Sequence, residues 1–187
     1  MDGAGPPFVE QVKCAHPDMR IEVWFEDEMR FGQQGTLARV WAPIGSGPRV
    51  VEQTEYEAVY VFGAANPTTG ESAAMVLPTA NTRLMNMFLA HLSEQVAPDV
   101  HVVLVLDNAG WHTGTDLEKP ENLTLLPLPP YAPELNAIEH LWDWMRSSHL
   151  ANRAYLDYDA VLDAGCDAWE SLTPGRIKSL CPTSWSV

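Results

Sequence analysis

The chain has 187 residues, 46% of them hydrophobic, and its 25 acidic and 11 basic side chains give a formal charge of −14. This composition excludes a disordered chain and fits one domain with a sizeable buried core. It also disfavours tight phosphate binding through charge alone, which needs clustered lysines and arginines. No apolar run approaches the roughly 18 residues of a membrane span, and no secretory apolar core is present, so we expect a cytoplasmic protein without a membrane partner.

Cysteine usage indicates a reducing compartment. Cys14, Cys166 and Cys181 are odd in number, lie far apart in the sequence and form no Cys-x-x-Cys pair. This spacing argues against a disulfide framework and against a zinc site. Reduced thiols in a cytosol therefore fit the sequence best.

The first strand is predicted directly after an irregular N-terminal segment. Residues 1–20 are expected to be an irregular lead-in, because glycines and prolines interrupt them. Residues 21–28 (IEVWFEDE) alternate apolar and polar residues, which predicts a strand. In that alternation Asp27 belongs to the apolar face, whereas Glu26 and Glu28 share the opposite face. Of three consecutive acids, one is therefore expected to face the core.

The remaining apolar patterns predict further strands and helices. Residues 101–107 (HVVLVLD) are apolar on both faces, as expected for a central strand covered on both sides. Residues 81–96 carry apolar residues at four-residue steps, which predicts an amphipathic helix with Asn81 or Thr82 as its N-cap. Other strands are predicted at 36–42, 56–64, 72–78 and 122–129, with 56–64 and 72–78 as a hairpin, and other helices at 135–149 and 160–172.

These elements define one α/β domain. Their order, in which strands precede and follow the helix at 81–96, predicts a mixed sheet flanked by helices. Residues 21–150 hold the core of this domain. Residues 151–187 are predicted to be a C-terminal helical extension of the same domain, since no shift in composition separates them from the core.

Three acidic residues lie at the ends of predicted core elements. Asp27 and Asp107 end apolar strands, and Glu139 lies early in a helix at the edge of its apolar stripe. Three inward carboxylates cannot all be ionised in a dry pocket without a counter-charge. No obvious paired arginines lie near them, and Arg30 and Arg146 are the only candidates. A hard divalent cation, Mg²⁺ or Mn²⁺, is the economical partner. Two such ions can clamp a phosphodiester for in-line displacement.

Each acid also has a simpler interpretation. Aspartate after a strand is common in turns, which fits Asp107 before Asn-Ala-Gly, and Glu139 alone fits an exposed helix position. A phosphoacceptor signalling domain also places acids at strand ends. It would need acids closer together and a lysine after a strand, and no lysine occurs between Lys13 and Lys119. It is therefore the combination of acids that makes a metal site a competitive interpretation.

Three sequence blocks carry a resemblance to a known family. WFEDEMRFG, VLVLDNAGWH and PPYAPELNAIEHLWDWM resemble the three blocks of the mariner-type DDE transposases, in the branch found in bacterial insertion sequences. The resemblance implies an RNase H-like fold, with a mixed five-stranded sheet flanked by helices, and a catalytic, metal-binding triad of Asp27, Asp107 and Glu139. The strand and helix faces select the same three residues independently of the resemblance.

The resemblance also implies a reaction and its partners. Mariner-type enzymes use Mg²⁺ or Mn²⁺ to cleave phosphodiesters at transposon ends, then transfer the freed 3′-hydroxyl to target DNA, typically at TA dinucleotides. Relatives usually act as dimers, so a homodimer that is nucleoid-associated when acting is expected.

One departure from the family limits these expectations. The family carries an N-terminal helix-turn-helix region that reads the terminal repeats, and the residues before the first predicted strand contain no such motif. The resemblance therefore covers the catalytic domain only. Two interpretations stay open: a transposase whose helix-turn-helix partner is encoded separately, and a non-autonomous or inactive remnant that keeps the fold.

Four further residues are candidates for supporting roles. Asn108 could orient Asp107 or a phosphate, and His112 could contact substrate or orient a water; a strand-end cap and a turn histidine are the simpler interpretations. Arg146 and Arg153 could form part of a modest DNA-facing patch, although each singly fits a solvated helix face.

Overall fold

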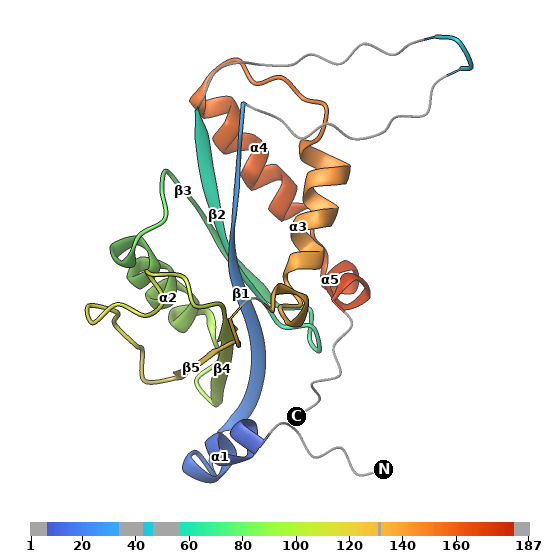
Figure 1. Cartoon of the computed structure of the whole chain (residues 1–187). Coiled ribbons are helices and arrows are strands. Elements are labelled where there is room, and N and C mark those ends of the chain that lie inside the picture. The colour runs from blue at the N-terminus through green and yellow to red at the C-terminus, as the bar shows by residue number, and fades with distance from the viewer. Residues whose placement is uncertain (1–6, 34–42, 47–56, 131, 182–187) are drawn as a thin grey trace.

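One mixed sheet organises the molecule. The computed structural model describes residues 7–33, 43–46, 57–130 and 132–181, and its strands form a five-stranded sheet in the order β3-β2-β1-β4-β5 (Figure 1). β1 to β3 are antiparallel neighbours, whereas β4 and β5 run parallel to β1. The predicted mixed five-stranded sheet is thereby confirmed. The strands are β1 (Arg20–Gly32), β2 (Ala58–Ala65), β3 (Ser72–Leu77), β4 (Val100–Leu106) and β5 (Leu123–Pro127).

Helices cover both faces of the sheet. α2 packs on one face, and α3, α4 and α5 pack on the other (Figure 1). No helix in the described part of the chain is long and apolar enough to cross a membrane. The helices are α1 (Pro7–Ala15), α2 (Thr82–Gln95), α3 (Glu139–Met145), α4 (Tyr158–Glu170) and α5 (Pro174–Leu180), with a 3₁₀ turn η1 (Pro133–Leu135) and a π turn η2 (Arg146–Leu150) flanking α3.

The strands are hydrophobic because an apolar cluster covers each face of the sheet. β4 is buried at every residue, as predicted for a strand covered on both sides. Phe25 and Trp24 illustrate the division, because Phe25 lies in the cluster beneath α3 and α4, and Trp24 lies in the cluster beneath α2. Asn81 caps α2 by accepting a hydrogen bond of 3.0 Å from the backbone N–H of Leu84, which confirms one of the two predicted caps.

Several expectations about local structure are corrected. The lead-in at 1–20 is not wholly irregular, because α1 begins at Pro7, a residue well suited to the first turn of a helix, and buries Val9 and Val12. The helix predicted over 135–149 is instead divided among η1, α3 and η2, and α3 begins only at Glu139. The strand predicted at 36–42 lies outside the described residues.

The position of Asp27 in β1 also differs from expectation. Asp27 does not end its strand, since β1 continues to Gly32 through antiparallel pairing with β2. Pairing with β4 stops earlier, at the pair Phe25 and Val105. Asp27 therefore lies where β4 ends beside a continuing β1, and the loop that begins with Asp107 emerges next to it.

Candidate active site

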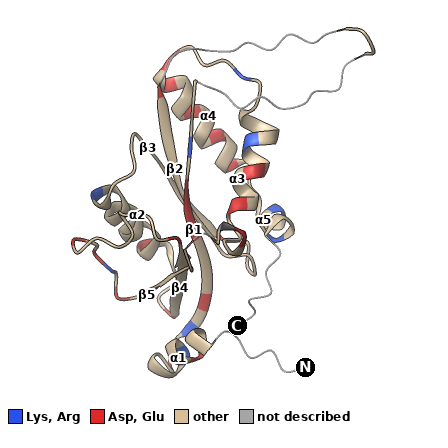
Figure 2. Cartoon of the chain, in the orientation of Figure 1, with Lys and Arg blue, Asp and Glu red and all other residues tan. Residues whose placement is uncertain are grey.

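The three predicted carboxylates line one open pocket. Asp27 comes from β1, Asp107 follows β4, and Glu139 is the first residue of α3. They share the wall of a pocket of about 440 Å³, together with Asn108, Asn136 and apolar residues of the segment after β5. The fold therefore brings together residues that lie far apart in the sequence. Figure 2 shows acidic residues on β1 and α3, the two elements that meet at this pocket.

Asp27 is half-buried and tied to α3. The indole Nε1–H of Trp142 donates a hydrogen bond of 2.9 Å to its Oδ2. Burial and, after it, the nearby carboxylate of Glu139 raise the pKa of Asp27 to about 7, although the Trp142 hydrogen bond acts to lower it. Asp27 and Glu139 are thus close enough to repel each other electrostatically, which is the situation that a cation between them relieves.

A glycine on the neighbouring strand makes room for Trp142. Gly63 of β2 pairs with Asp27 across the ladder. A Cβ atom at Gly63 would lie 2.6 Å from Cη2 of Trp142 and 2.7 Å from Cζ3 of Trp169. The two indoles pack with their centroids 5.7 Å apart. The missing side chain at Gly63 therefore lets α3 approach the sheet closely enough for the Trp142 hydrogen bond.

Asp107 is the exposed member of the triad. Its side chain is 54% exposed, and Oδ1 accepts hydrogen bonds from the backbone N–H of Ala109 at 2.7 Å and from Nδ1 of His112 at 2.8 Å. The hydrogen bond with His112 is the main reason that the pKa of Asp107 lies below its ordinary value. Asp107 is therefore an ionised carboxylate that faces the pocket at neutral pH.

His112 supplies a counter-charge that the sequence did not reveal. Its ring is 1% exposed, and Nε2 lies 3.0 Å from Oε1 of Glu28 and 3.6 Å from Oε2 of Glu26. Burial alone would lower the pKa of His112, but its hydrogen bonds with Asp107 and Glu28 outweigh burial and raise this pKa to about 11. In the metal-free protein His112 is therefore an imidazolium that joins Asp107 to the carboxylates of β1.

The position of Glu139 depends on hydrogen bonds that join the segment before α3 to β1. Nδ2 of Asn136 donates a hydrogen bond of 2.9 Å to the backbone carbonyl of Glu26, and Asn136 is buried. The backbone N–H of Glu139 then donates to the carbonyl of Asn136 at 3.2 Å. This link fixes the start of α3 against the strand that carries Asp27.

The other three predicted candidates, Asn108, Arg146 and Arg153, make no hydrogen bond with the three carboxylates in the described part of the chain. Asn108 lines the pocket, but its Nδ2 donates to the carbonyl of Leu128, which connects the end of β4 to the segment after β5. This contact agrees with the simpler interpretation of Asn108 as a strand-end residue. Arg146 is partly buried and lies 3.7 Å from the exposed Asp143, its i, i+3 neighbour, and Arg153 is exposed. Neither arginine is among the residues that line the pocket.

Sequence reasoning missed three residues that support the site. Trp142 lies at an apolar position of its helix, which predicts packing alone, yet its indole N–H donates a hydrogen bond to Asp27. Glu28 was placed on the face opposite Asp27, but its link to His112 joins segments 84 residues apart. Asn136 falls inside the helix predicted over 135–149, whereas in the structure it precedes α3 and donates to the backbone of β1. Local sequence patterns do not predict such contacts, because the contacts depend on which loops the sheet brings together.

The residues of the pocket fit a hard divalent cation. Three carboxylates from separate elements supply the oxygen ligands that Mg²⁺ and Mn²⁺ prefer. The repulsion that raises the pKa of Asp27 would be reversed by a cation, which favours the ionised form. The open wall of the pocket leaves room for waters or phosphate oxygens.

Comparison with known proteins places the chain in a family. Residues 22–162 match the DDE superfamily endonuclease family. The chain belongs to the DDE superfamily of endonucleases. The uncharacterized protein y4pE/y4sA of Sinorhizobium fredii is 42% identical to this DDE endonuclease over 129 residues, which cover 68% of this chain and 96% of that protein. The insertion element IS630 uncharacterized 39 kDa protein of Shigella sonnei is 22% identical over 148 residues, 77% of this chain and 42% of that protein.

Solved transposases share the fold of this DDE endonuclease. The Mos1 transposase paired-end complex with the left transposon end superposes with a TM-score of 0.65 at 17% identity, covering 93% of this chain and 55% of that one. The Mos1 mariner paired-end complex with Mn gives a TM-score of 0.66 at 16% identity, covering 95% and 58%. The chain thus spans little more than half of these transposases. The predicted resemblance to a DDE transposase catalytic domain with an RNase H-like fold is confirmed.

Proposed function

We propose that this DDE endonuclease is the metal-dependent catalytic domain of a transposase, which cleaves phosphodiesters at transposon ends and transfers the 3′-hydroxyl to target DNA. The observation that carries the proposal is the convergence of Asp27, Asp107 and Glu139 on one open pocket from three distant parts of the chain. Carboxylates arranged in this way suit phosphoryl chemistry better than acid–base chemistry on a neutral substrate.

In this proposal the three carboxylates are the metal ligands, and Mg²⁺ or Mn²⁺, as two ions, is the cofactor. Such ions, when bound, activate the attacking oxygen and neutralise the charge that develops on the phosphate. The chain itself orients the ligands: Trp142 holds Asp27, His112 holds Asp107, and the Asn136 link holds the start of the helix that bears Glu139. Solved Mos1 complexes were crystallised with Mn and with Mg, which supports the choice of ions.

DNA is the proposed partner. Solved neighbours are transposase complexes, one of them with a left transposon end. For this chain we propose transposon ends and a target at a TA dinucleotide as substrates, a homodimer at the nucleoid as the active form, and a helix-turn-helix region, encoded separately, as the reader of the ends. Arg146 and Arg153 would contact the DNA backbone.

The decisive experiment measures metal binding and nicking with matched variants. Calorimetric titration with Mn²⁺ and nicking of supercoiled plasmid are followed for the wild type and for Asp107→Asn, Asp27→Asn and Glu139→Gln. The control is Asp143→Asn, an exposed acid on the same helix as Glu139. We expect each triad variant to lose nicking by about a thousandfold, since a metal ion contributes several kcal/mol to such a reaction, and the control to match the wild type.

The same experiment separates the proposal from its alternative. A wild-type protein that binds no Mn²⁺ would overturn the metal site and with it the function. A protein that binds Mn²⁺ through the triad but nicks no DNA, even when supplied with a helix-turn-helix partner, would be the inactive remnant.

A further inference from the structure

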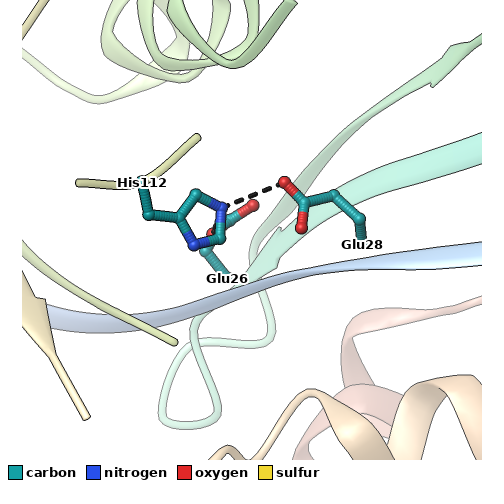
Figure 3. Close-up of side chains that lie close together, drawn as sticks. All are labelled: Glu26, Glu28 and His112. Carbon is teal, nitrogen blue, oxygen red and sulfur yellow. Dashed lines mark hydrogen bonds and ion pairs between the residues drawn. The ribbon is translucent and has the colours of Figure 1, made fainter. Parts of the chain in front are cut away.

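A second group of metal-ligating side chains lies on the face of β1 opposite Asp27. Glu26 and Glu28 project from β1 to this face, and His112 reaches them from the loop after β4 (Figure 3). One ligand atom from each residue lies within 4.8 Å of the other two. The three side chains are at most 4% exposed. Because side chains alternate along a strand, this group is separated from the pocket into which Asp27 points.

Glu26 is the unexplained member of the group. Its side chain is fully buried, and neither of its oxygens has a hydrogen-bond partner among the described residues. Glu28, in contrast, accepts hydrogen bonds from Nε1 of Trp111 at 2.8 Å and from Nε2 of His112 at 3.0 Å. The contact of Glu26 with His112 at 3.6 Å is too long for a hydrogen bond, and a buried carboxyl without hydrogen bonds is costly. Both oxygens of Glu26 therefore make no hydrogen bond among the described residues that a ligand would have to break.

His112 has the orientation of a metal-bound histidine. Its Nδ1 lies 2.8 Å from Oδ1 of Asp107, while Nε2 faces the two glutamates. Metal-ligating histidines almost always donate the other ring N–H to a carboxylate or carbonyl, which fixes the ring and raises its basicity. Asp107 has that outer position here, so the second group is connected to the triad through a single hydrogen bond.

We propose that Glu26, Glu28 and His112 form a structural site for a divalent transition-metal ion of the zinc type, distinct from the ions of the Asp27 pocket. One imidazole and two carboxylates suit Zn²⁺ better than Mg²⁺, which prefers oxygen ligands throughout. The ion takes the place of the proton on Nε2 of His112, which leaves to solvent, and its two charges balance the two glutamates. The closed surroundings are those of structural metal sites.

This inference does not rest on the proposed function. The site uses no cysteine, so the spacing of the three cysteines gives no sign of it. Its occupant would fix the loop between Asp107 and His112 against β1, since that loop supplies one ligand and the strand supplies two.

Zn²⁺ binding to the whole chain tests the site. Metal-stripped protein in excess Mg²⁺ is titrated with Zn²⁺, and the number of bound ions is counted by native mass spectrometry. We expect one Zn²⁺ per chain in the wild type and in Asp27→Asn, whose side chain points away from the group. Asp107→Asn should lower the affinity by about 10–100-fold, as losses of an outer-shell partner do. Glu26→Gln, an isosteric change at a position without hydrogen bonds, should lower it further.

An NMR measurement on the wild-type protein tests the site even if a variant folds poorly. In the wild type, addition of Zn²⁺ should change the ¹⁵N resonances of the His112 ring. They should then show that Nδ1 keeps its proton and that Nε2 carries none. The proposal is overturned if the wild type retains no Zn²⁺, if the ring stays doubly protonated at saturating Zn²⁺, or if Asp27→Asn removes the bound ion. The last outcome would place Zn²⁺ in the triad pocket and would leave the proposed function intact.

Discussion

Nε1 of Trp142 lies 2.9 Å from Oδ2 of Asp27 and donates a hydrogen bond to it. The contact joins α3 to β1, the two elements that supply Glu139 and Asp27. One short helix therefore provides both a carboxylate that raises the pKa of Asp27 and an N–H that lowers it. The ionisation of Asp27, and hence its use as a metal ligand, depends on how closely α3 packs against the sheet.

Replacing Trp142 by phenylalanine should weaken metal binding at neutral pH. Without the N–H the pKa of Asp27 rises above about 7, so a smaller fraction of the carboxyl is ionised. A hydrogen bond to a charged group contributes about 1.5–3 kcal/mol, so the Mn²⁺ affinity at pH 7 should fall by about tenfold or more, and by less at pH 8.5. Calorimetry at both pH values measures this. Trp144→Phe, on the same helix, is the control, and an equal loss in both variants would contradict the role of the hydrogen bond.

The stability of the metal-free protein should depend on the protonation of Asp27. The folded-state pKa of about 7 lies above the value of about 3.9 expected in the unfolded chain. The folded state therefore binds the proton more tightly, and its stabilising contribution is complete below about pH 4 and is lost as the pH rises to about 7. Mn²⁺ should increase the stability most at pH values near 7 and above, because it binds the ionised form of Asp27.

Thermal unfolding from pH 4.5 to pH 8.5, with and without Mn²⁺, measures this dependence. Asp27→Asn removes the titrating carboxyl and should reduce the change in stability between pH 4.5 and pH 7. The difference between wild type and variant then gives the contribution of Asp27 apart from that of His112. A wild-type profile that coincides with that of Asp27→Asn would show that the Asp27 pKa is not raised.

Gly63→Ala should destabilise the protein by displacing two indoles. The new Cβ atom would lie 2.6 Å from Trp142 and 2.7 Å from Trp169, and overpacking of this kind costs about 1–3 kcal/mol. Chemical denaturation should show that loss, and Mn²⁺ affinity should fall as well, because Trp142 moves away from Asp27. Gly175→Ala is the matched control: nothing lies within 4 Å of a Cβ there, and alanine favours the helix α5. Loss of stability without loss of Mn²⁺ affinity would separate the packing role of Trp142 from its role at Asp27.

Arg146 and Arg153 should contribute to DNA affinity without sequence preference. A contact with one phosphate adds about 0.9 to the salt dependence of binding, so Arg146→Ala and Arg153→Ala should each reduce the slope of log affinity against log salt by about one. Fluorescence anisotropy with duplex DNA at several salt concentrations provides the slopes. Lys13→Ala, on α1, should leave the slope unchanged, and a similar change in all three variants would indicate general charge effects rather than a DNA-facing patch.

Local patterns predicted much of the fold. The burial of β4 on both faces, the hairpin of β2 and β3 and the Asn81 cap depend on residues close together in the sequence, where hydrophobic period and cap chemistry act. The length of β1 and the late start of α3 could not be predicted in this way. Pairing with β2 extends β1 past Asp27, and the Asn136 hydrogen bond to the β1 backbone fixes the segment ahead of α3.

The sequence by itself determined which residues carry the candidate chemistry. Alternation along β1 placed Asp27 on one face and Glu26 with Glu28 on the other, and the three motif blocks selected Asp27, Asp107 and Glu139. Only the tertiary structure decided what surrounds each carboxyl. Parallel pairing of β1 and β4 brings the loop of Asp107 beside Asp27, so that His112 reaches Glu28. Because burial and neighbouring charges set the ionisation of a carboxyl, and both depend on residues distant in sequence, that part of the site follows from the fold alone.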